Sequence, residues 1–205
     1  YRKQARFKLI TTGKISQKSL LFEDQHLERL TKASRYFAYP FDAEDLKQKI
    51  EGECQACDAN QDYRLRISLN KSGEIELSRQ ILTPLSPKFC QAKLCLQEAD
   101  LQQAFTYFKT THRPHLSLGK QEIIYHNAAG ELLETSIGNL VLKIAGKLYT
   151  PPIRLGILAG IYRQHLLERG QVEEKVLTLK DLAQAEAIYG CNAVREMYEL
   201  LLKEK

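Results

Sequence analysis

One alternating stretch constrains the fold of this chain more than any other feature. Residues 63–70 alternate apolar and polar side chains, and after the turn 71–73 the alternation resumes at Ile75 and Leu77. Successive side chains of a strand point to opposite faces of its sheet, so a period of two marks one apolar and one polar face. The pattern predicts a half-buried antiparallel hairpin.

The residues before this hairpin predict a small α/β unit. Apolar positions around residues 7–9 and 20–22 predict an opening hairpin. Leucine, alanine and phenylalanine then recur at helical spacing over residues 24–37, and Pro40 closes that helix. Asp42 is suited to cap a second short helix, because its carboxylate can accept hydrogen bonds from the first free N–H groups.

Pro84 and Pro87 predict a domain boundary, since proline disfavours continuing either a helix or a strand. We therefore expect a small N-terminal α/β domain over residues 1–86 and a larger domain over residues 87–205. The elements expected in the second domain are strands at 123–125, 140–144, 148–150 and 187–189, and helices at 157–168, after Thr178 and after Arg195.

Composition excludes several classes of protein. Basic residues exceed acidic ones by 30 − 25 = 5, but they are scattered, which favours ordinary solvated surface over a nucleic-acid or membrane-binding face. No apolar stretch approaches the ~20 residues that span a bilayer. Residues 1–6 lack the apolar middle of a secretory signal, so we expect the cytoplasm. We also expect the five cysteines to be reduced thiols.

Metal ligands are the first candidates for a functional site. Cys54 and Cys57 have the spacing of zinc ligands, but they form only half of a four-ligand site and no second pair follows. His112 and His115 flank a turn, where solvent-exposed histidine is the commoner explanation. We predict no metal site. The glycine-rich dinucleotide, phosphate-loop and hydrolase motifs are also absent from the sequence.

Three further segments carry weak local signals. Lys109 ends an apolar stretch, where a surface lysine is the ordinary interpretation. Residues 134–139, Glu-Thr-Ser-Ile-Gly-Asn, precede the most apolar strand and would suit an ordinary turn. Residues 156–163 lead glycines into a helix, whose free N–H groups and positive dipole end suit an anion, although a plain glycine-rich turn explains them equally well.

Together with His26-Leu27-Glu28-Arg29-Leu30, these segments resemble, in order, the motifs of fold type IV pyridoxal-phosphate enzymes. That family comprises branched-chain aminotransferases, D-amino acid aminotransferases and aminodeoxychorismate lyases. The resemblance extends from about residue 7 to residue 192. It implies a two-domain α+β or α/β fold like that of D-amino acid aminotransferase, with pyridoxal 5'-phosphate as cofactor.

The resemblance also implies roles for single residues. Lys109 would hold the cofactor as a Schiff base and act as the catalytic base. Glu134 would face the pyridine nitrogen, and Arg29 would pair with the phosphate. The remaining implied cofactor-binding positions are the backbone N–H groups of Ile161 and Tyr162, and the side chains of Asn139 and Asn192.

Finer details favour the lyases within the family. Thr11-Thr12 stands where aminotransferases usually have Glu-Thr or Glu-Gly, and Cys-Asn-Ala at 191–193 resembles a lyase ending. The hairpin at 63–69 resembles lyase domains fused behind the chorismate-aminating component, and a chain that begins at Tyr1 suits such a fragment. We therefore expect an aminodeoxychorismate lyase, with Thr12 as a second catalytic residue.

Two other interpretations stay open. A class IV aminotransferase acting on D-amino or branched-chain amino acids would use the same lysine. A non-catalytic remnant is suggested by one departure: where relatives place a tyrosine for the ring oxygen of the cofactor, this chain has residues 114–116, Pro-His-Leu. The expected partners are a small-molecule substrate, a second copy of the chain in a homodimer, and the chorismate-aminating component, either fused to this chain or working with it, with no nucleic acid and no membrane.

Overall fold

The computed structural model describes residues 7–97, 101, 104–117, 119 and 121–203. The chain divides into two compact units. Unit 1 consists of Tyr1–Thr83 with Phe108–Arg113, and unit 2 consists of Pro84–Tyr107 with Pro114–Lys205. Residues 1–6, from which the sequence argument on a secretory signal was drawn, lie outside the described part.

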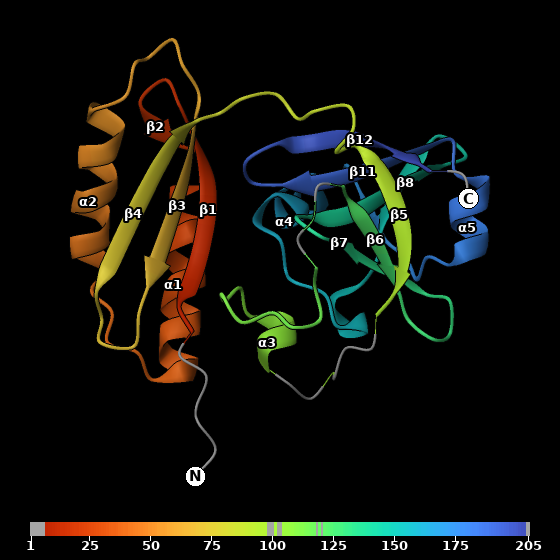
Figure 1. The fold of residues 1–205 in the computed structure, drawn as a ribbon, viewed down its shortest axis with the longest axis horizontal. Coiled ribbons are helices and arrows are strands. Elements are labelled where there is room, and N and C mark those ends of the chain that lie inside the picture. Colours follow the sequence, from red (N-terminus) through yellow and green to blue (C-terminus); the bar gives the residue numbers. More distant parts are fainter. Residues whose placement is uncertain (1–6, 98–100, 102–103, 118, 120, 204–205) are drawn as a thin grey trace. The chain divides into compact units, whose positions relative to one another are not determined.

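Unit 1 is an antiparallel sheet with two helices on one face, as Figure 1 shows. The strand order is β2-β1-β3-β4. Its elements are β1 (Leu9–Ser16), β2 (Ser19–Leu20), α1 (Glu23–Phe37), α2 (Ala43–Gln55), β3 (Tyr63–Leu69) and β4 (Ile75–Ile81). Both predicted helices and both predicted hairpins are present. The turn of the opening hairpin, expected near Gly13, lies instead at Gln17 and Lys18, because Gly13 is inside β1 and pairs with Leu65.

Local sequence explains these elements. Leu9, Leu65 and Ile67, on odd-numbered positions of β1 and β3, are at most 1% exposed and belong to one core with the apolar side of α1 and α2. Asp42 caps α2 as predicted, because its carboxylate accepts hydrogen bonds from the N–H groups of residues 44 and 45 at 2.9 and 3.1 Å. The even-numbered side chains point to the other face of the sheet.

Residues 108–113 return to unit 1, whereas the prolines suggested a single break after residue 86. Leu9 and Thr110 face each other in an antiparallel bridge. The N–H of Ile10 donates to the carbonyl of Lys109 at 3.0 Å, and the N–H of Thr111 donates to the carbonyl of Lys8 at 2.9 Å. The segment thus pairs with the edge of β1 at residues 8–10. Turn residues in the sequence do not reveal this long-range pairing.

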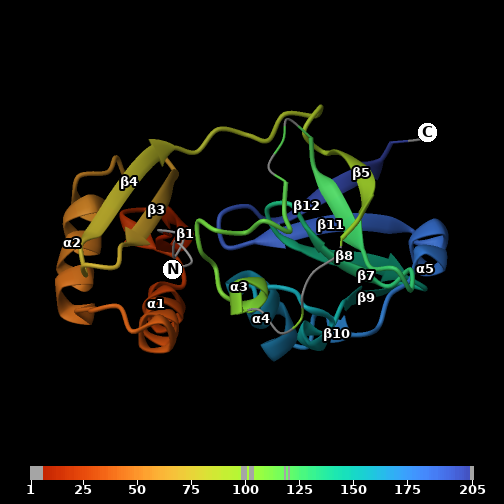
Figure 2. The same ribbon diagram turned by 60° about the horizontal axis from the view of Figure 1, so that its bottom comes forward.

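Unit 2 contains one large mixed sheet, seen in Figures 1 and 2, with strand order β10-β9-β8-β11-β12-β5-β6-β7. A further pairing of β7 with β8 closes part of this sheet into a barrel. The strands are β5 (Gln91–Leu96), β6 (Ile123–His126), β7 (Leu132–Thr135), β8 (Asn139–Ile144), β9 (Lys147–Thr150), β10 (Glu173–Glu174), β11 (Ala187–Asn192) and β12 (Glu196–Leu202). The helices are α3 (Ala104–Tyr107), a 3-10 turn (Ile153–Leu155), α4 (Ile161–Glu168) and α5 (Leu179–Gln184).

Two expectations for unit 2 were wrong in detail. The segment after Arg195 is a strand, β12, and not a helix, because it pairs with β11 on one side and β5 on the other. These pairings override the helical preference of its Glu, Met and Leu residues. The helix expected from residue 157 begins at Ile161, since Gly160 is extended, with φ −69° and ψ 137°.

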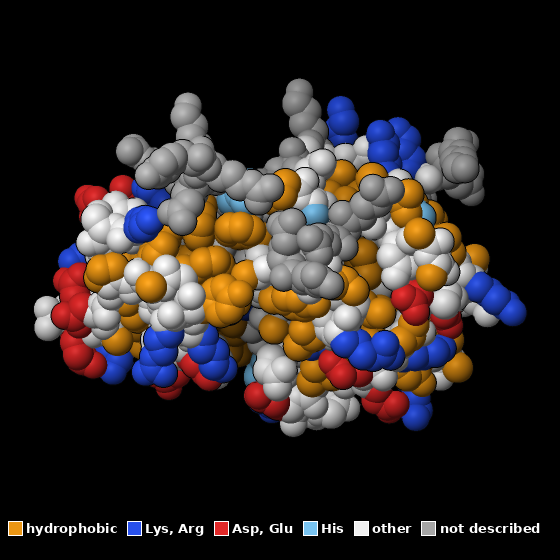
Figure 3. Space-filling model, turned by 90° about the horizontal axis from the view of Figure 1, so that it is seen from below, with side chains coloured by type: hydrophobic (Ala, Val, Ile, Leu, Met, Phe, Trp, Pro, Cys, Tyr) orange, Lys and Arg blue, Asp and Glu red, His pale blue; other side chains and the backbone are white. Residues whose placement is uncertain are grey.

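The surface shows mixed chemistry. On the face in Figure 3, basic, acidic and hydrophobic side chains lie side by side. Within the described residues, no helix is both long enough and apolar enough to cross a membrane. All five cysteines are free thiols.

Candidate functional site

Lys109 projects from the face of the unit 1 sheet that lies opposite the helices. Thr110 is 1% exposed and shares the helix side with Leu9 across their bridge. Side chains alternate along an extended segment, so Lys109 and Thr111 point to the other face. We call this the polar face; its described members include Lys8, Thr12, Arg66, Ser68, Glu76, Lys109 and Thr111.

The two consecutive threonines of β1 face opposite ways. Thr11 is fully buried on the helix side, where its hydroxyl lies 2.6 Å from Nδ1 of His26 on α1. Thr12 is 8% exposed on the polar face, directly opposite Arg66 of β3. Only Thr12 therefore shares a face with Lys109, which agrees with its selection from the sequence.

Basic side chains gather where α1 approaches the segment that carries Lys109. Burial, with a smaller effect from the charge of Arg113, lowers the pKa of Arg29 to about 10. Burial, followed by the charges of Arg29 and Lys109, lowers the pKa of His26 to about 3, so this imidazole is neutral near pH 7. Arg29, Lys109 and Arg113 form what we call the cationic cluster, an environment that favours an anion.

The turn between β7 and β8 positions the predicted residues of unit 2. Glu134 and Asn139 are opposite each other at the ends of these strands, and they are 2% and 3% exposed. The N–H of Leu158 donates to Glu134 at 3.4 Å, and the amide of Asn139 donates to the carbonyl of Leu158 at 2.8 Å. Both side chains are thereby tied to the segment that leads into α4.

The start of α4 packs closely against Asn139. Gly160 is the N-cap of α4 and provides no side-chain hydrogen bond, and Ile161 and Tyr162 are the first residues of the helix. The N–H groups of a first helical turn have no carbonyl partner within the helix. A Cβ added to Gly160 would lie 1.9 Å from Oδ1 of Asn139. Only glycine allows this close approach between the helix start and Asn139.

Asn192 is held by the loop after β11. Its side-chain oxygen accepts hydrogen bonds from the N–H groups of Val194 and Arg195, both at 2.9 Å. Its amide donates to the carbonyl of Ile137 at 3.3 Å. These bonds join the loop to the turn that carries Glu134 and Asn139. The role of Asn192 beside a phosphate stays a prediction.

Sequence reasoning missed a buried acid below this turn. Glu122 is fully buried and accepts hydrogen bonds from the hydroxyls of Ser136 and Tyr198. Burial raises the pKa of Glu122, although those hydrogen bonds and the nearby backbone N–H groups oppose the rise. The sequence pattern before Glu122 predicted no strand, and Tyr198 lies in the segment that was expected to be a helix. The sequence therefore gave no signal that these two side chains would meet.

Gly160→Ala provides a test of the close approach at α4. We expect a loss of about 1–3 kcal/mol in the free energy of unfolding, because overpacking forces Asn139 to move, together with weaker binding of pyridoxal phosphate. Gly52→Ala is the control: a Cβ there meets nothing within 4 Å in α2, and it should stabilise by about 0.5–1 kcal/mol. Denaturant unfolding and absorbance titration with the cofactor measure both effects, and equal behaviour of the two variants would contradict the steric argument.

The metal candidates do not come together. Cys54 and Cys57 are buried in the core of unit 1, and His112 and His115 are partly buried rather than exposed. Within the part of the chain that is described, no group of three or more His, Cys, Asp or Glu side chains is placed to hold a metal ion.

Residues 8–200 match the family described as amino-transferase class IV. A Schizosaccharomyces pombe protein provisionally named aminodeoxychorismate lyase is 25% identical over 189 residues, which cover 84% of this chain and 80% of that protein. A Mesorhizobium loti structure provisionally named amino-acid aminotransferase is 27% identical, with a TM-score of 0.83, and the match covers 96% of this chain and all of that one (100%).

A more distant structure, a hypothetical aminotransferase from Mycobacterium tuberculosis in its PLP-bound form, is similar in fold. Its TM-score is 0.79 at 19% identity, and the match covers 96% of this chain and 81% of that one. Similarity of this kind concerns the fold and not the substrate.

Proposed function

This chain belongs to the class IV aminotransferase family of pyridoxal-phosphate-dependent enzymes, and from that premise we propose that it is an aminodeoxychorismate lyase. The reaction would convert 4-amino-4-deoxychorismate into 4-aminobenzoate and pyruvate. The observation that carries the proposal is that Lys109 and the hydroxyl-bearing Thr12 project from the same polar face of unit 1. The name of the S. pombe relative supports it.

The described residues fit the cofactor of the family. The cationic cluster around Arg29 suits its phosphate, whose oxygens a guanidinium meets two at a time. The uncapped start of α4 offers N–H groups to the same kind of anion. Buried Glu134 supplies a carboxylate for a protonated ring nitrogen. In our proposal these residues and Asn139 hold pyridoxal phosphate, with Lys109 as its covalent attachment.

Lys109 would act twice. Pyridoxal phosphate, when bound, withdraws electrons from the substrate carbon that carries nitrogen. The free amine of Lys109 would accept the proton from that carbon. In this proposal, the segment bridged to β1 that carries Lys109 would set the side from which the proton is removed.

Thr12 would assist the departure of the enolpyruvyl group. A threonine hydroxyl can donate a hydrogen bond to the ether oxygen as its bond to the ring carbon breaks. The C–H and C–O bonds that break leave an aromatic ring, and the proton passes to the released enolpyruvate, which becomes pyruvate. Neither water nor an oxo acid is consumed, so a single substrate suffices.

Transamination is the second candidate, because the M. loti relative is named an aminotransferase and matches nearly the whole chain. That reaction needs the same base but also a keto-acid acceptor. The two reactions therefore differ in what must be supplied, and this difference makes them separable.

The assay offers 4-amino-4-deoxychorismate alone, and then D- and L-amino acids with 2-oxoglutarate. We expect 4-aminobenzoate and pyruvate to form in equal amounts from the first mixture without any acceptor, and no keto acid above background from the others. Fluorescence of 4-aminobenzoate and a coupled pyruvate assay measure the products. If products formed only from the amino-acid mixtures, the lyase assignment would be wrong and the aminotransferase assignment would stand.

A further inference from the structure

We propose that Arg66 binds a carboxylate of the substrate on the polar face of unit 1, beside Thr12 and Lys109. This inference rests on the proposed function in that the substrate is taken to be an aromatic-acid precursor. It adds a residue that sets specificity for an anionic substrate.

The register of the sheet places Arg66 next to the proposed catalytic groups. Arg66 of β3 is directly opposite Thr12 of β1, and Ser68 is opposite Ile10. On its other edge, β1 pairs with the segment in which Lys109 is opposite Ile10. Directly opposite and diagonal side chains on one face of a sheet lie within reach of each other when they are long. A small molecule at Lys109 and Thr12 would thus adjoin Arg66.

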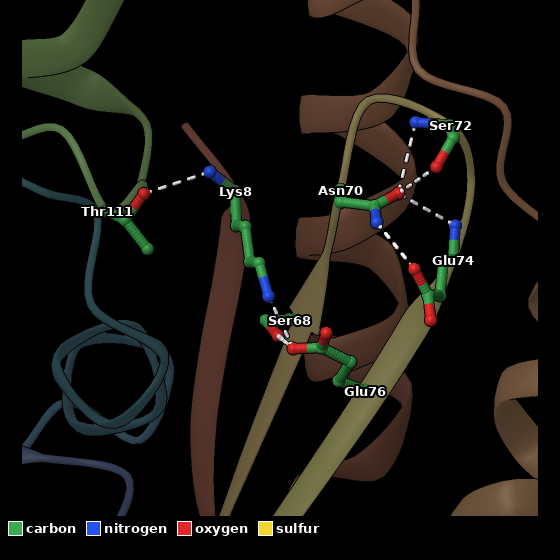
Figure 4. Close-up of polar contacts among 7 residues, drawn as sticks. All are labelled: Lys8, Ser68, Asn70, Ser72, Glu74, Glu76 and Thr111. Atoms are coloured by element: carbon green, nitrogen blue, oxygen red, sulfur yellow. Dashed lines mark hydrogen bonds and ion pairs between the residues drawn. The ribbon is translucent and has the colours of Figure 1, made fainter. Parts of the chain in front are cut away.

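The charge of Arg66 is available to a ligand. Arg66 is partly buried, yet among the described residues its side chain makes neither a hydrogen bond nor an ion pair. The acid nearest to it on this face, Glu76, is already bonded to Lys8 at 2.5 Å and to Ser68 at 3.3 Å, as Figure 4 shows. The hydrogen bond from Lys8, followed by the positive charge of Lys8, lowers the pKa of Glu76.

Arg79 shows what a structural arginine looks like in the same sheet. It lies one strand away on the helix side, where it pairs with Glu53 at 3.2 Å. The side chain of Arg66 has no such bond to the described residues, and none of its nitrogens is among their fully buried polar atoms without a partner, so a ligand can reach them. A carboxylate ligand would supply that bond to Arg66.

There is also space for such a ligand. A cavity of about 620 Å³ opens on the polar face, a volume typical of small-molecule sites. Its wall includes Lys8, Arg66, Ser68, Glu76, Ser78 and Thr111. The planar guanidinium can bind both oxygens of one carboxylate, which would fix the direction of the substrate ring.

The test compares 4-aminobenzoate with its neutral isostere 4-aminobenzamide, using calorimetry on protein loaded with pyridoxal phosphate. We expect wild-type protein to prefer the acid, and Arg66→Gln to weaken binding of the acid about 10- to 100-fold, the value of a charge-assisted hydrogen bond, with the amide unchanged. Arg66→Lys should fall between them, since it keeps the charge but loses the two-pronged geometry. Arg79→Gln is the matched control and should bind the acid as wild type does.

Wild-type protein without a preference for the acid, or Arg66→Gln and Arg66→Lys that both keep it, would overturn the proposal. Thermal unfolding of each variant separates a local effect from a folding defect, and Arg66→Lys preserves the test if Arg66→Gln does not fold. The lyase assay is independent: if it fails while Arg66 still discriminates acid from amide, the reaction is wrong and the carboxylate site stands.

Discussion

Lys109→Ala should abolish turnover, with a loss of about 10⁴-fold or more, because one substitution removes both the covalent attachment and the base. Borohydride reduction of wild-type protein, followed by peptide mapping, should place the cofactor on Lys109. The same treatment of the variant should leave no adduct.

Lys143→Ala is the matched control for this experiment. Lys143 lies on β8, 3.7 Å from Glu186, and its side chain is 42% exposed. An exposed ion pair contributes little, about 0–1 kcal/mol, so this variant should keep both activity and the adduct on Lys109. An adduct on another lysine of the wild-type protein, or an active Lys109→Ala, would end the assignment.

Local signals explain why much of the fold was predictable. The period of two in β3 and β4, the helical period of α1 and the cap residue Asp42 each act within a few residues. Thr178 likewise opens α5 with a capping box to Asp181. Such elements need no knowledge of distant partners.

What the sequence could not predict depends on pairing between distant segments. Strand β12 has helical composition and is extended only because β11 and β5 flank it. Strands β5 and β7 carry short apolar patterns that their neighbours in the sheet complete. The return of residues 108–113 to β1 is likewise set by hydrogen bonds across about a hundred residues of sequence.

Some residues of the candidate site could be predicted from local sequence, and others depend on pairing between distant segments. The order of the family motifs in the sequence indicated Lys109, Arg29 and Glu134. The alternation of side chains along paired extended segments places Thr12 and Lys109 on one face of the sheet. Arg66 looked like one polar residue in an alternating strand, and its position opposite Thr12 required the register between β1 and β3. A single sequence contains the alternation but not the register.

Glu134→Gln should keep the cofactor and lose most of the activity. The side chain is 2% exposed and accepts a hydrogen bond from the N–H of Leu158 at 3.4 Å, a bond that the amide oxygen of glutamine can also accept. The shape of the site is therefore retained while its negative charge is removed. A protonated ring nitrogen needs that charge, and an unprotonated ring withdraws electrons less well.

We expect kcat to fall on the order of 10²- to 10³-fold, as for loss of one preorganised electrostatic contact, with cofactor affinity changed only a few-fold. Absorbance of the bound cofactor reports retention, and release of 4-aminobenzoate reports the rate. Glu131→Gln is the control near the start of β7, because Glu131 bonds the amide of Asn127 at 2.7 Å and has no place in the proposed site. If Glu134→Gln matched Glu131→Gln in rate, another acid would have to face the ring nitrogen, and the assignment of Glu134 would fail.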